Sequence, residues 1–393
     1  GQHQETELRV LFQKAFLVFL LAWVTPAGAA APFDTPATYA LIMDYETGAV
    51  LFEKNADEPT APASMSKLMT VAIVFDKIKR GELSPSDEFY VSEKAWSKRG
   101  SKMWVRVDTK IPLIDLLRGV IIQSGNDACI VIAENISGTE EAFAELMTRT
   151  ARSWGMENST FANASGWPDP DQKMSMRDLA MLARRIIMEH PEYYSIFAED
   201  KFTWEGIEQA NRNPLLGAFD GADGLKTGHT DESGYGLVGT AVRDGVRRII
   251  VMNGLGSEKA RAIETRRFMR IAFNDFQKVQ LFGRGDIVGE ASVFAGKAPT
   301  VPLVVSTPIE RIVHRSQLDQ VKATFVYDGP LEAPVAEAQQ VGYLKLHVAD
   351  EVVSEHPLYA GRNVSALGVF GKIGLAAKVL LAKPDRGGEA AVQ

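Results

Sequence analysis

Hydrophobic residues recur with two different periods in the first part of the chain. Residues 39–45 and 49–52 are apolar runs separated by a Glu-Thr-Gly turn, which predicts a β-hairpin. From 65 to 79 the apolar residues recur at helical spacing, which predicts a buried helix with Ser64 at its N-terminus. We therefore expect the first domain to open with a strand pair followed by a helix.

Helical patterns dominate the middle of the chain and short strands follow them. The helical stretches cover 113–122, 128–136, 140–154 and 176–188. Three strands joined by short links, which favour an antiparallel sheet, are expected at 224–229, 234–242 and 246–252. A helix over 257–276 can cover one face of that sheet. The pattern predicts an α+β domain spanning 34–278.

After residue 278 the pattern changes to β-strands separated by turns. Strands are expected at 286–293, 302–305, 310–313, 322–327, 342–348 and 352–356. This predicts a small all-β sandwich domain at 279–362. The last segment, 363–393, places apolar residues on one helical face with lysines nearby, which favours an amphipathic segment on a membrane surface. Three glycines weaken that helix, so a frayed or packed tail is the alternative.

The N-terminal segment indicates where the protein goes. Arg9 and Lys14 precede an apolar run at 15–24, and small residues follow up to Ala29, which is typical of a secretory signal peptide over 1–29. The run is too short to span about 30 Å of hydrocarbon comfortably, which disfavours the alternative of an uncleaved anchor. We expect an exported protein of the bacterial envelope.

Composition excludes several classes of function. The 393 residues suffice for two domains. The chain has 43 basic and 50 acidic residues, a net charge of −7, which argues against nucleic acid as a partner. The single cysteine, Cys129, cannot form an internal disulfide, and the six histidines lack metal-ligand spacing. We therefore expect no metal site.

The first chemical motif is Ser64-Met65-Ser66-Lys67. Positions three apart share a face of a helix, so the Lys67 amine can reach the Ser64 hydroxyl and act as its base. Free backbone N–H groups at a helix N-terminus suit an oxyanion beside Ser64. A lysine with an ordinary pKa of about 10.4 is a poor base at neutral pH, so a second cation should lower it. Taken alone, the motif is also compatible with an ordinary surface helix.

Two further motifs carry serine, amide and lysine side chains. Ser124 and Asn126 lie between two helical runs, where they could relay a proton and hold a substrate carbonyl, or simply cap a helix. Lys226 and Thr227 lie on a predicted strand and could bind a carboxylate, with Gly228 letting a ligand approach the backbone. An exposed strand lysine is the alternative for this motif.

Together and in this order, the three motifs form the signature of serine penicillin-recognising enzymes. The sequence resembles the low-molecular-mass penicillin-binding proteins that are D-alanyl-D-alanine carboxypeptidases, over roughly residues 35 to 380. The match extends through residues 124–129, 163–166 and 223–230. The resemblance implies a penicillin-binding or β-lactamase-like transpeptidase domain, then a β-sandwich and a C-terminal anchor. It also implies a peripheral location on the periplasmic face of the cytoplasmic membrane.

The resemblance also implies roles for the catalytic residues. Ser64 would be the acylated nucleophile, Lys67 its proton acceptor and Ser124 the relay to the departing D-alanine. The backbone N–H groups of Ser64 and His229 would form the oxyanion hole. The His229 side chain is not expected to be a base, because the sequence has no G-x-S-x-G elbow. Cys129 matches a family cysteine, but burial on its helix is the simpler interpretation.

The remaining candidate residues bind substrate in this interpretation. Asn126 would orient the peptide, and Thr227 would hydrogen-bond it. Lys226 would attract the terminal carboxylate and lower the pKa of Lys67 by repulsion. Arg212 and Arg261 are weaker candidates for the same carboxylate, with ordinary surface ion pairs as the alternative.

The predicted function is hydrolysis of the terminal D-Ala from peptidoglycan pentapeptides through an acyl-enzyme, with β-lactam antibiotics as covalent inhibitors. No cofactor is implied, since covalent catalysis in a polarised pocket suffices. A peptidoglycan D,D-endopeptidase needs the same residues and stays an alternative. A β-lactamase is disfavoured, because a class A enzyme would need a Glu-x-x-Leu-Asn segment between 124 and 226. A non-catalytic cell-wall-binding protein is a distant third.

Overall fold

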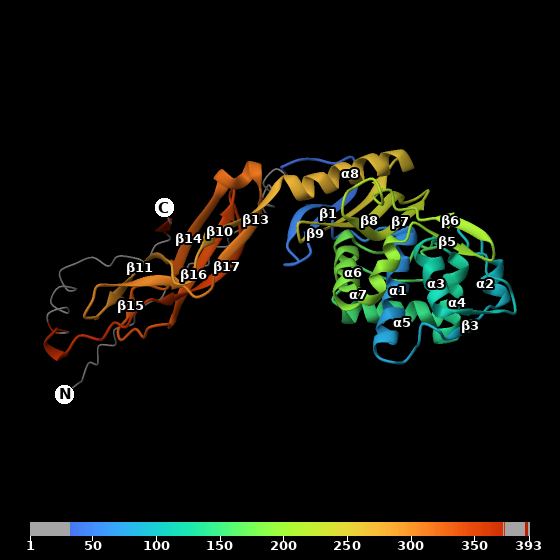
Figure 1. Cartoon of the computed structure of the whole chain (residues 1–393). Coiled ribbons are helices and arrows are strands. Elements are labelled where there is room, and N and C mark those ends of the chain that lie inside the picture. The colour runs from blue at the N-terminus through green and yellow to red at the C-terminus, as the bar shows by residue number, and fades with distance from the viewer. Residues whose placement is uncertain (1–31, 372, 374–389, 392–393) are drawn as a thin grey trace, which may run out of the picture.

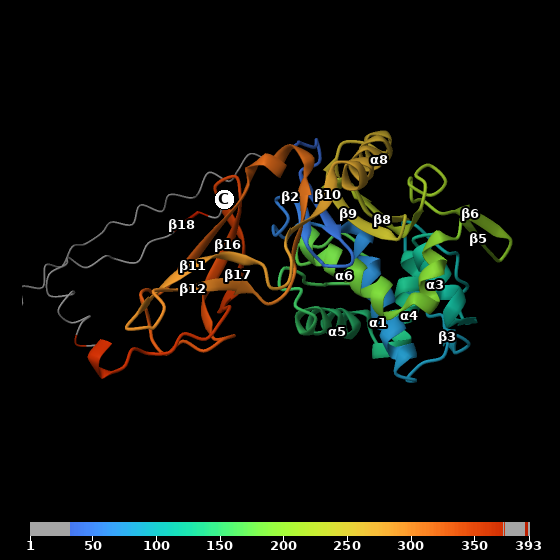
Figure 2. The ribbon, with the colours of Figure 1, turned by 60° about the vertical axis from the view of Figure 1, so that its left-hand side comes forward.

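The computed structural model describes residues 32–371, 373 and 390–391. A helix-rich domain and an all-β domain lie end to end in both views (Figures 1 and 2). The segment expected to be a signal peptide lies outside the described residues, as does most of 363–393. Within the described part, the α+β domain followed by an all-β domain is confirmed.

A five-stranded antiparallel sheet forms the centre of the first domain. Its order is β2-β1-β9-β8-β7. Leu41 and Met43 pack against the helices on one face, whereas Ala40 and Ile42 belong to a second core on the other. Burial on both faces explains why residues 39–43 of β1 form a continuous apolar run. The strands are β1 (Tyr39–Asp44), β2 (Val50–Lys54), β7 (Ala222–Thr230), β8 (Gly234–Arg243) and β9 (Val246–Leu255).

Helices cover both faces of this sheet. α8 (Glu258–Asn274) lies along one face, and the helical cluster lies on the other (Figure 1). At the centre of that cluster is α1 (Lys67–Lys79), of which the first nine residues are buried. The others are α2 (Glu93–Ser97), α3 (Leu113–Ile121), α4 (Asn126–Ser137), α5 (Glu140–Ser153), α6 (Met176–Glu189) and α7 (Pro191–Tyr194).

Short elements complete this domain. Two 3₁₀ turns, η1 (Ala63–Ser66) and η2 (Ser195–Ala198), precede α1 and follow α7. Two small hairpins pair β3 (Glu88–Tyr90) with β4 (Lys110–Pro112), and β5 (Lys201–Trp204) with β6 (Ile207–Ala210).

The second domain has a seven-stranded sheet and a strand pair. The sheet order is β15-β11-β12-β17-β16-β14-β18, and β10 pairs with β13. The elements are β10 (Phe276–Phe282), β11 (Ile287–Phe294), β12 (Thr300–Val305), β13 (Ile309–His314), η3 (Arg315–Gln320), β14 (Val321–Tyr327), β15 (Leu331–Glu332), β16 (Gln340–Val348), β17 (Glu351–Ala360) and β18 (Ala390–Ala391). Each expected strand of this region is present.

The junction between the domains differs from the expectation. The helix expected to reach residue 276 ends at Asn274, and Phe276 begins β10, which the sequence analysis did not predict. The expected boundary at 278/279 therefore falls inside a strand that pairs with β13. Phe276 belongs to the core beneath α8 and also packs edge-on against His314. One apolar residue thus serves both domains, which a composition shift cannot reveal.

Within residues 32–371, no helix is long and apolar enough to cross a bilayer. The same residues contain no group of His, Cys, Asp or Glu side chains suited to hold a metal ion.

Candidate active site

Ser64 and Lys67 lie where η1 runs into α1. Ser64 is on the 3₁₀ turn and Lys67 is the first residue of the α-helix, so the expected helical start is tighter than predicted. Residues three apart nearly eclipse in a 3₁₀ turn. The Lys67 Nζ is accordingly 2.8 Å from the Ser64 Oγ. The contact inferred from their spacing is present.

Lys67 is completely buried, and its amine has two further partners. Its Nζ lies 2.8 Å from the Asn126 Oδ1 and 2.7 Å from the Ser165 carbonyl oxygen. Burial lowers the pKa of Lys67 from its usual 10.5 to about 8, and the cations Arg212 and Lys98 add repulsion. The site therefore makes the neutral amine accessible near physiological pH.

Ser124 lies in the turn between α3 and α4, with a left-handed φ of +57°. This turn brings its Oγ to 3.1 Å from the Lys226 Nζ. Asn126 is the first residue of α4 and makes no capping hydrogen bond there, because its Oδ1 accepts from Lys67. Its Nδ2 donates to the Arg99 carbonyl at 3.0 Å. The capping interpretation of this motif is therefore wrong.

Lys226 is buried on β7, and its amine points at the Ser124 hydroxyl. Besides Ser124 it contacts the Thr227 carbonyl at 3.0 Å, so the interpretation as an exposed strand lysine is wrong. Burial first, and repulsion from Lys67 second, hold the pKa of Lys226 well below its usual range. Repulsion from Lys226 was expected to be what lowers the pKa of Lys67. Burial is the larger cause for both lysines, and the two repel each other.

Gly228 was expected to let a ligand approach the backbone, but another segment of the chain occupies that space. A Cβ there would lie 2.8 Å from the Pro62 carbonyl oxygen and 3.2 Å from the Met65 nitrogen. The space beside Gly228 is thus filled by the chain that carries Ser64, and not by a ligand. The glycine lets η1 approach β7, which brings the serine close to the strand that carries Lys226.

The two arginines lie in different surroundings. Arg212 is exposed and donates from Nη1 to the Ser101 Oγ at 2.7 Å. Arg261 is only 6% exposed on α8, and its Nη1 is 3.4 Å from the Gly228 carbonyl oxygen. It also pairs with Glu258 at 3.7 Å. Arg261 is therefore a buried residue next to the Gly228 carbonyl of β7, and its ion pair joins it to an exposed glutamate on its own helix.

The side chain of His229 packs against an aromatic ring. Its ring centroid is 3.9 Å from that of Tyr235, and the Arg261 guanidinium lies 5.4 Å from the same tyrosine ring. Among the described residues, no hydrogen bond joins the His229 ring to Ser64 or Lys67. This arrangement agrees with the expectation that the imidazole is not the base.

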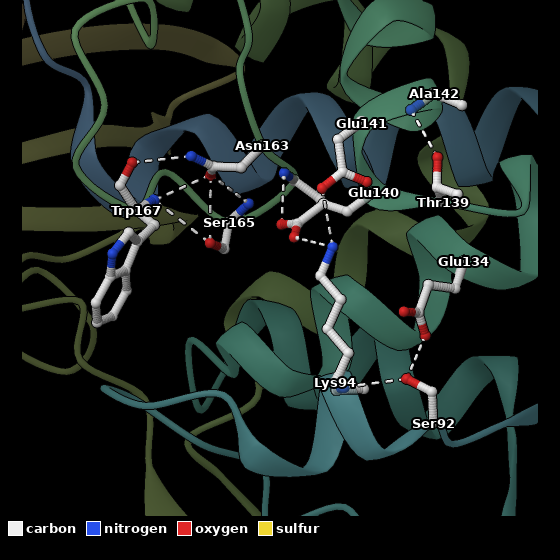
Figure 3. A network of polar contacts seen from close by, with 12 residues as sticks. Ser92, Lys94, Glu134, Thr139, Glu140, Glu141, Ala142, Asn163, Ser165 and Trp167 are labelled. Atoms are coloured by element: carbon white, nitrogen blue, oxygen red, sulfur yellow. Dashed lines mark hydrogen bonds and ion pairs between the residues drawn. The ribbon is translucent and has the colours of Figure 1, made fainter.

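The role of the 163–167 turn was not predicted from the sequence, where residues 163–166 carried only part of the family resemblance. Asn163 Oδ1 accepts from the backbone N–H of Gly166 at 2.8 Å and of Trp167 at 3.0 Å, and its Nδ2 donates to the Trp167 carbonyl (Figure 3). Gly166 has φ +82°, and a Cβ there would lie 1.8 Å from the Ala63 carbonyl oxygen. The turn thus presents the Ser165 carbonyl to Lys67.

Asp127 is a second residue that the sequence analysis did not single out. Its buried carboxylate accepts hydrogen bonds from the backbone N–H groups of Met103, Trp104 and Val105 at 2.8 to 3.1 Å. The loop that passes Asn126 is held in this way. Only its position directly after the Ser-Gly-Asn motif could have indicated this role.

Cys129 is buried on α4, and it is a free thiol. Burial raises the pKa of Cys129 to about 12. The packing interpretation of this cysteine is confirmed.

Known proteins resemble the chain along most of its length. A family model described as D-alanyl-D-alanine carboxypeptidase, Peptidase S11, matches residues 26–256. The chain belongs to this family. A model of the C-terminal domain of penicillin-binding protein 5 matches residues 276–366, and α8 occupies most of the gap between the two matches. The three motifs therefore identified a serine-type D-alanyl-D-alanine carboxypeptidase correctly.

Individual relatives agree with this assignment. The carboxypeptidase is 34% identical over 354 residues to D-alanyl-D-alanine carboxypeptidase DacA of Haemophilus influenzae, covering 88% of this chain and 89% of that one. The crystal structure of DacD from Francisella tularensis superposes with a TM-score of 0.76 at 32% identity, over 86% of this chain and 96% of that one. Penicillin-binding protein D2 of Listeria monocytogenes, solved in its ampicillin-bound form, has a TM-score of 0.57 at 30% identity, over 62% and 99%.

Proposed function

We propose that this carboxypeptidase removes the terminal D-Ala from peptidoglycan pentapeptide stems through an acyl-enzyme on Ser64. The observation that carries the proposal is the 2.8 Å contact between the Ser64 hydroxyl and the fully buried Lys67 amine. A nucleophile beside a base of lowered pKa is the arrangement that acyl transfer through a covalent intermediate requires.

Neutral Lys67 can satisfy all three of its contacts and still act as the base. An amine has two N–H donors and one lone pair. The donors serve the Asn126 Oδ1 and the Ser165 carbonyl, and the lone pair accepts the proton of Ser64. The Ser64 Oγ then attacks the scissile carbonyl carbon, while the backbone N–H groups of Ser64 and His229 stabilise the oxyanion.

The leaving group needs a proton, and Ser124 is the proposed relay. Its hydroxyl gives a proton to the amide nitrogen as the C–N bond breaks and D-alanine departs, and the proton that Lys67 took from Ser64 passes to Ser124. The Lys226 Nζ, 3.1 Å from the Ser124 Oγ, holds this hydroxyl in place. A water molecule then attacks the ester with Lys67 as its base. The ester bond breaks, Ser64 regains its proton, and the shortened peptide leaves with a new carboxylate.

The terminal carboxylate of the substrate is expected at the Lys226 end of the site. Lys226 and Thr227 on β7 and the exposed Arg212 supply cations and a hydroxyl there. A bound carboxylate would favour the charged form of Lys226 and so offset its burial. Arg261, buried on α8, contacts the Gly228 carbonyl oxygen and adds positive potential near it.

β-Lactams are the proposed covalent inhibitors of the same serine. Their strained amide would acylate Ser64 by the route described for the peptide. The ampicillin-bound form of the Listeria relative supports this proposal.

We also propose that the protein is exported and acts on the periplasmic face of the inner membrane. The charged and apolar N-terminal segment supports export. Val369, Phe370 and Ile373 are each more than 60% exposed near the C-terminal end, which supports insertion of this segment into a membrane surface.

Two measurements test the proposed activity. Fluorescent penicillin should label the wild type and not Ser64→Ala, whose melting temperature shows that it is folded. The wild type should release D-alanine from a pentapeptide over many turnovers. Labelling of Ser64→Ala would contradict the assignment of the nucleophile, and a single burst without turnover would contradict the hydrolysis.

A further inference from the structure

Two side chains at the edge of the site, Lys98 and Trp167, have no assigned contact with the substrate in the catalytic scheme. The Lys98 Nζ lies over the Trp167 ring, 4.4 Å from its centroid. Lys98 follows α2, and Trp167 closes the turn that presents the Ser165 carbonyl to Lys67. Trp167 is 39% exposed, and its ring extends away from the hydrogen bonds that hold its backbone (Figure 3). The fold thus holds Lys98 and Trp167 in contact, and the Trp167 ring remains accessible to a ligand.

This pair adjoins Asn126 directly. A Cβ on Gly100 would lie 2.7 Å from the Asn126 Nδ2 and 3.0 Å from the Trp167 ring. The Arg99 carbonyl already accepts a hydrogen bond from that Nδ2. The loop that carries Lys98 therefore contacts both the amide proposed to orient the peptide and the indole beside it.

The direction of a bound peptide follows from the proposed roles. The terminal carboxylate belongs at Lys226, which contacts Ser124. Asn126 and the turn at Ser165 hold Lys67 through separate contacts. A peptide whose scissile carbonyl is at Ser64 and whose end is at Lys226 must leave past Asn126. Its upstream residues then meet Lys98 and Trp167.

The edge carries positive charge without acidic partners. Within the described residues, neither Lys98 nor Arg99 forms an ion pair, and Lys98 is close enough to lower the pKa of Lys67 by repulsion. The nearby carboxylate of Asp127 is buried and saturated by backbone N–H groups. A cation beside an indole face fits a ligand that has an aliphatic stem and a carboxylate.

We propose that Lys98, positioned over Trp167, selects stem peptides that carry a free carboxylate upstream of the D-Ala-D-Ala unit. This inference rests on the proposed function, because it needs that substrate bound in that direction. Two residues of the stem peptide could supply this free carboxylate. One is a third residue of diaminopimelic acid, and the other is the α-carboxylate of a γ-linked glutamate in second place.

Four synthetic pentapeptides show which of these two residues supplies the recognised carboxylate. They combine glutamate or isoglutamine in second place with diaminopimelic acid or lysine in third place, and kcat/KM for D-alanine release is measured for each. The wild type should prefer the peptide with the recognised carboxylate by about threefold to fivefold, the size expected of a solvent-screened ion pair. The preference should shrink at high salt.

Three variants test whether Lys98 causes the preference for the peptide with the recognised carboxylate. Lys98→Met should abolish the preference, and Lys98→Arg should retain it. Lys102→Met is the matched control, because that lysine is in the same loop but donates to the Trp96 carbonyl and lies over Trp104. Loss of repulsion on Lys67 would slow all four peptides alike, so the ratio reports carboxylate recognition alone.

The outcomes are distinct. Equal rates on all four peptides in the wild type, or an unchanged preference in Lys98→Met, would overturn the inference and leave the carboxypeptidase activity standing. No D-alanine release from any peptide would contradict the proposed function and this inference with it.

Discussion

The burial of Lys67 should determine how acylation depends on pH. Because the base must be neutral, the rate follows the unprotonated fraction of Lys67. With a pKa of about 8, about 9% of the amine is neutral at pH 7, against about 0.03% for an exposed lysine at 10.5. The protein environment therefore raises the neutral fraction about 300-fold at pH 7.

The lowered pKa of Lys67 sets how the acylation rate changes with pH. The pKa is lowered, so the neutral base is present above about pH 8 and is lost as the pH falls through that value. The acylation rate with fluorescent penicillin, measured from pH 5.5 to 9.5, should rise about tenfold per pH unit and level off above about pH 8. Because Lys67 and Lys226 repel each other, the fitted midpoint belongs to the pair.

Lys67→Arg is the decisive perturbation. A guanidinium stays protonated throughout this range, so acylation should fall by about 10²- to 10⁴-fold and should not recover at high pH. Circular dichroism and the melting temperature verify that the variant is folded. A wild-type rate that is flat with pH, a midpoint near 10.5, or a wild-type profile in Lys67→Arg would refute the reasoning.

Two further predictions concern the surroundings of the site. Gly166→Ala should lower the free energy of unfolding in urea by about 1–3 kcal/mol more than Gly138→Ala. Both glycines have φ +82°, but only at Gly166 would a Cβ strike the Ala63 carbonyl; equal losses would contradict this. Cys129, buried and with a pKa of about 12, should resist a thiol reagent at pH 8 until urea unfolds the protein, and fast labelling of the native protein would show that the thiol is accessible.

Much of the fold could be predicted because it depends on neighbours in the sequence. Period-two and helical patterns located nearly all of the larger strands and helices to within a few residues. The exception, β10, follows α8 after a single residue, so no turn signal separates them. The contact of Ser64 with Lys67 was equally predictable, because one turn of helix fixes it.

The chain alone thus determined the order of elements, the three motifs and the pairing of serine with lysine, since each is set within a few residues. Tertiary packing decided the rest. It buried Lys67 and Lys226, and their low pKa values depend on that burial more than on their mutual charge. It also filled the space at Gly228 with the chain that carries Ser64, and it buried Arg261 beside the Gly228 carbonyl. These properties depend on how segments that lie 59 to 102 residues apart in the sequence pack together, and local periodicity carries no information about contacts over such separations.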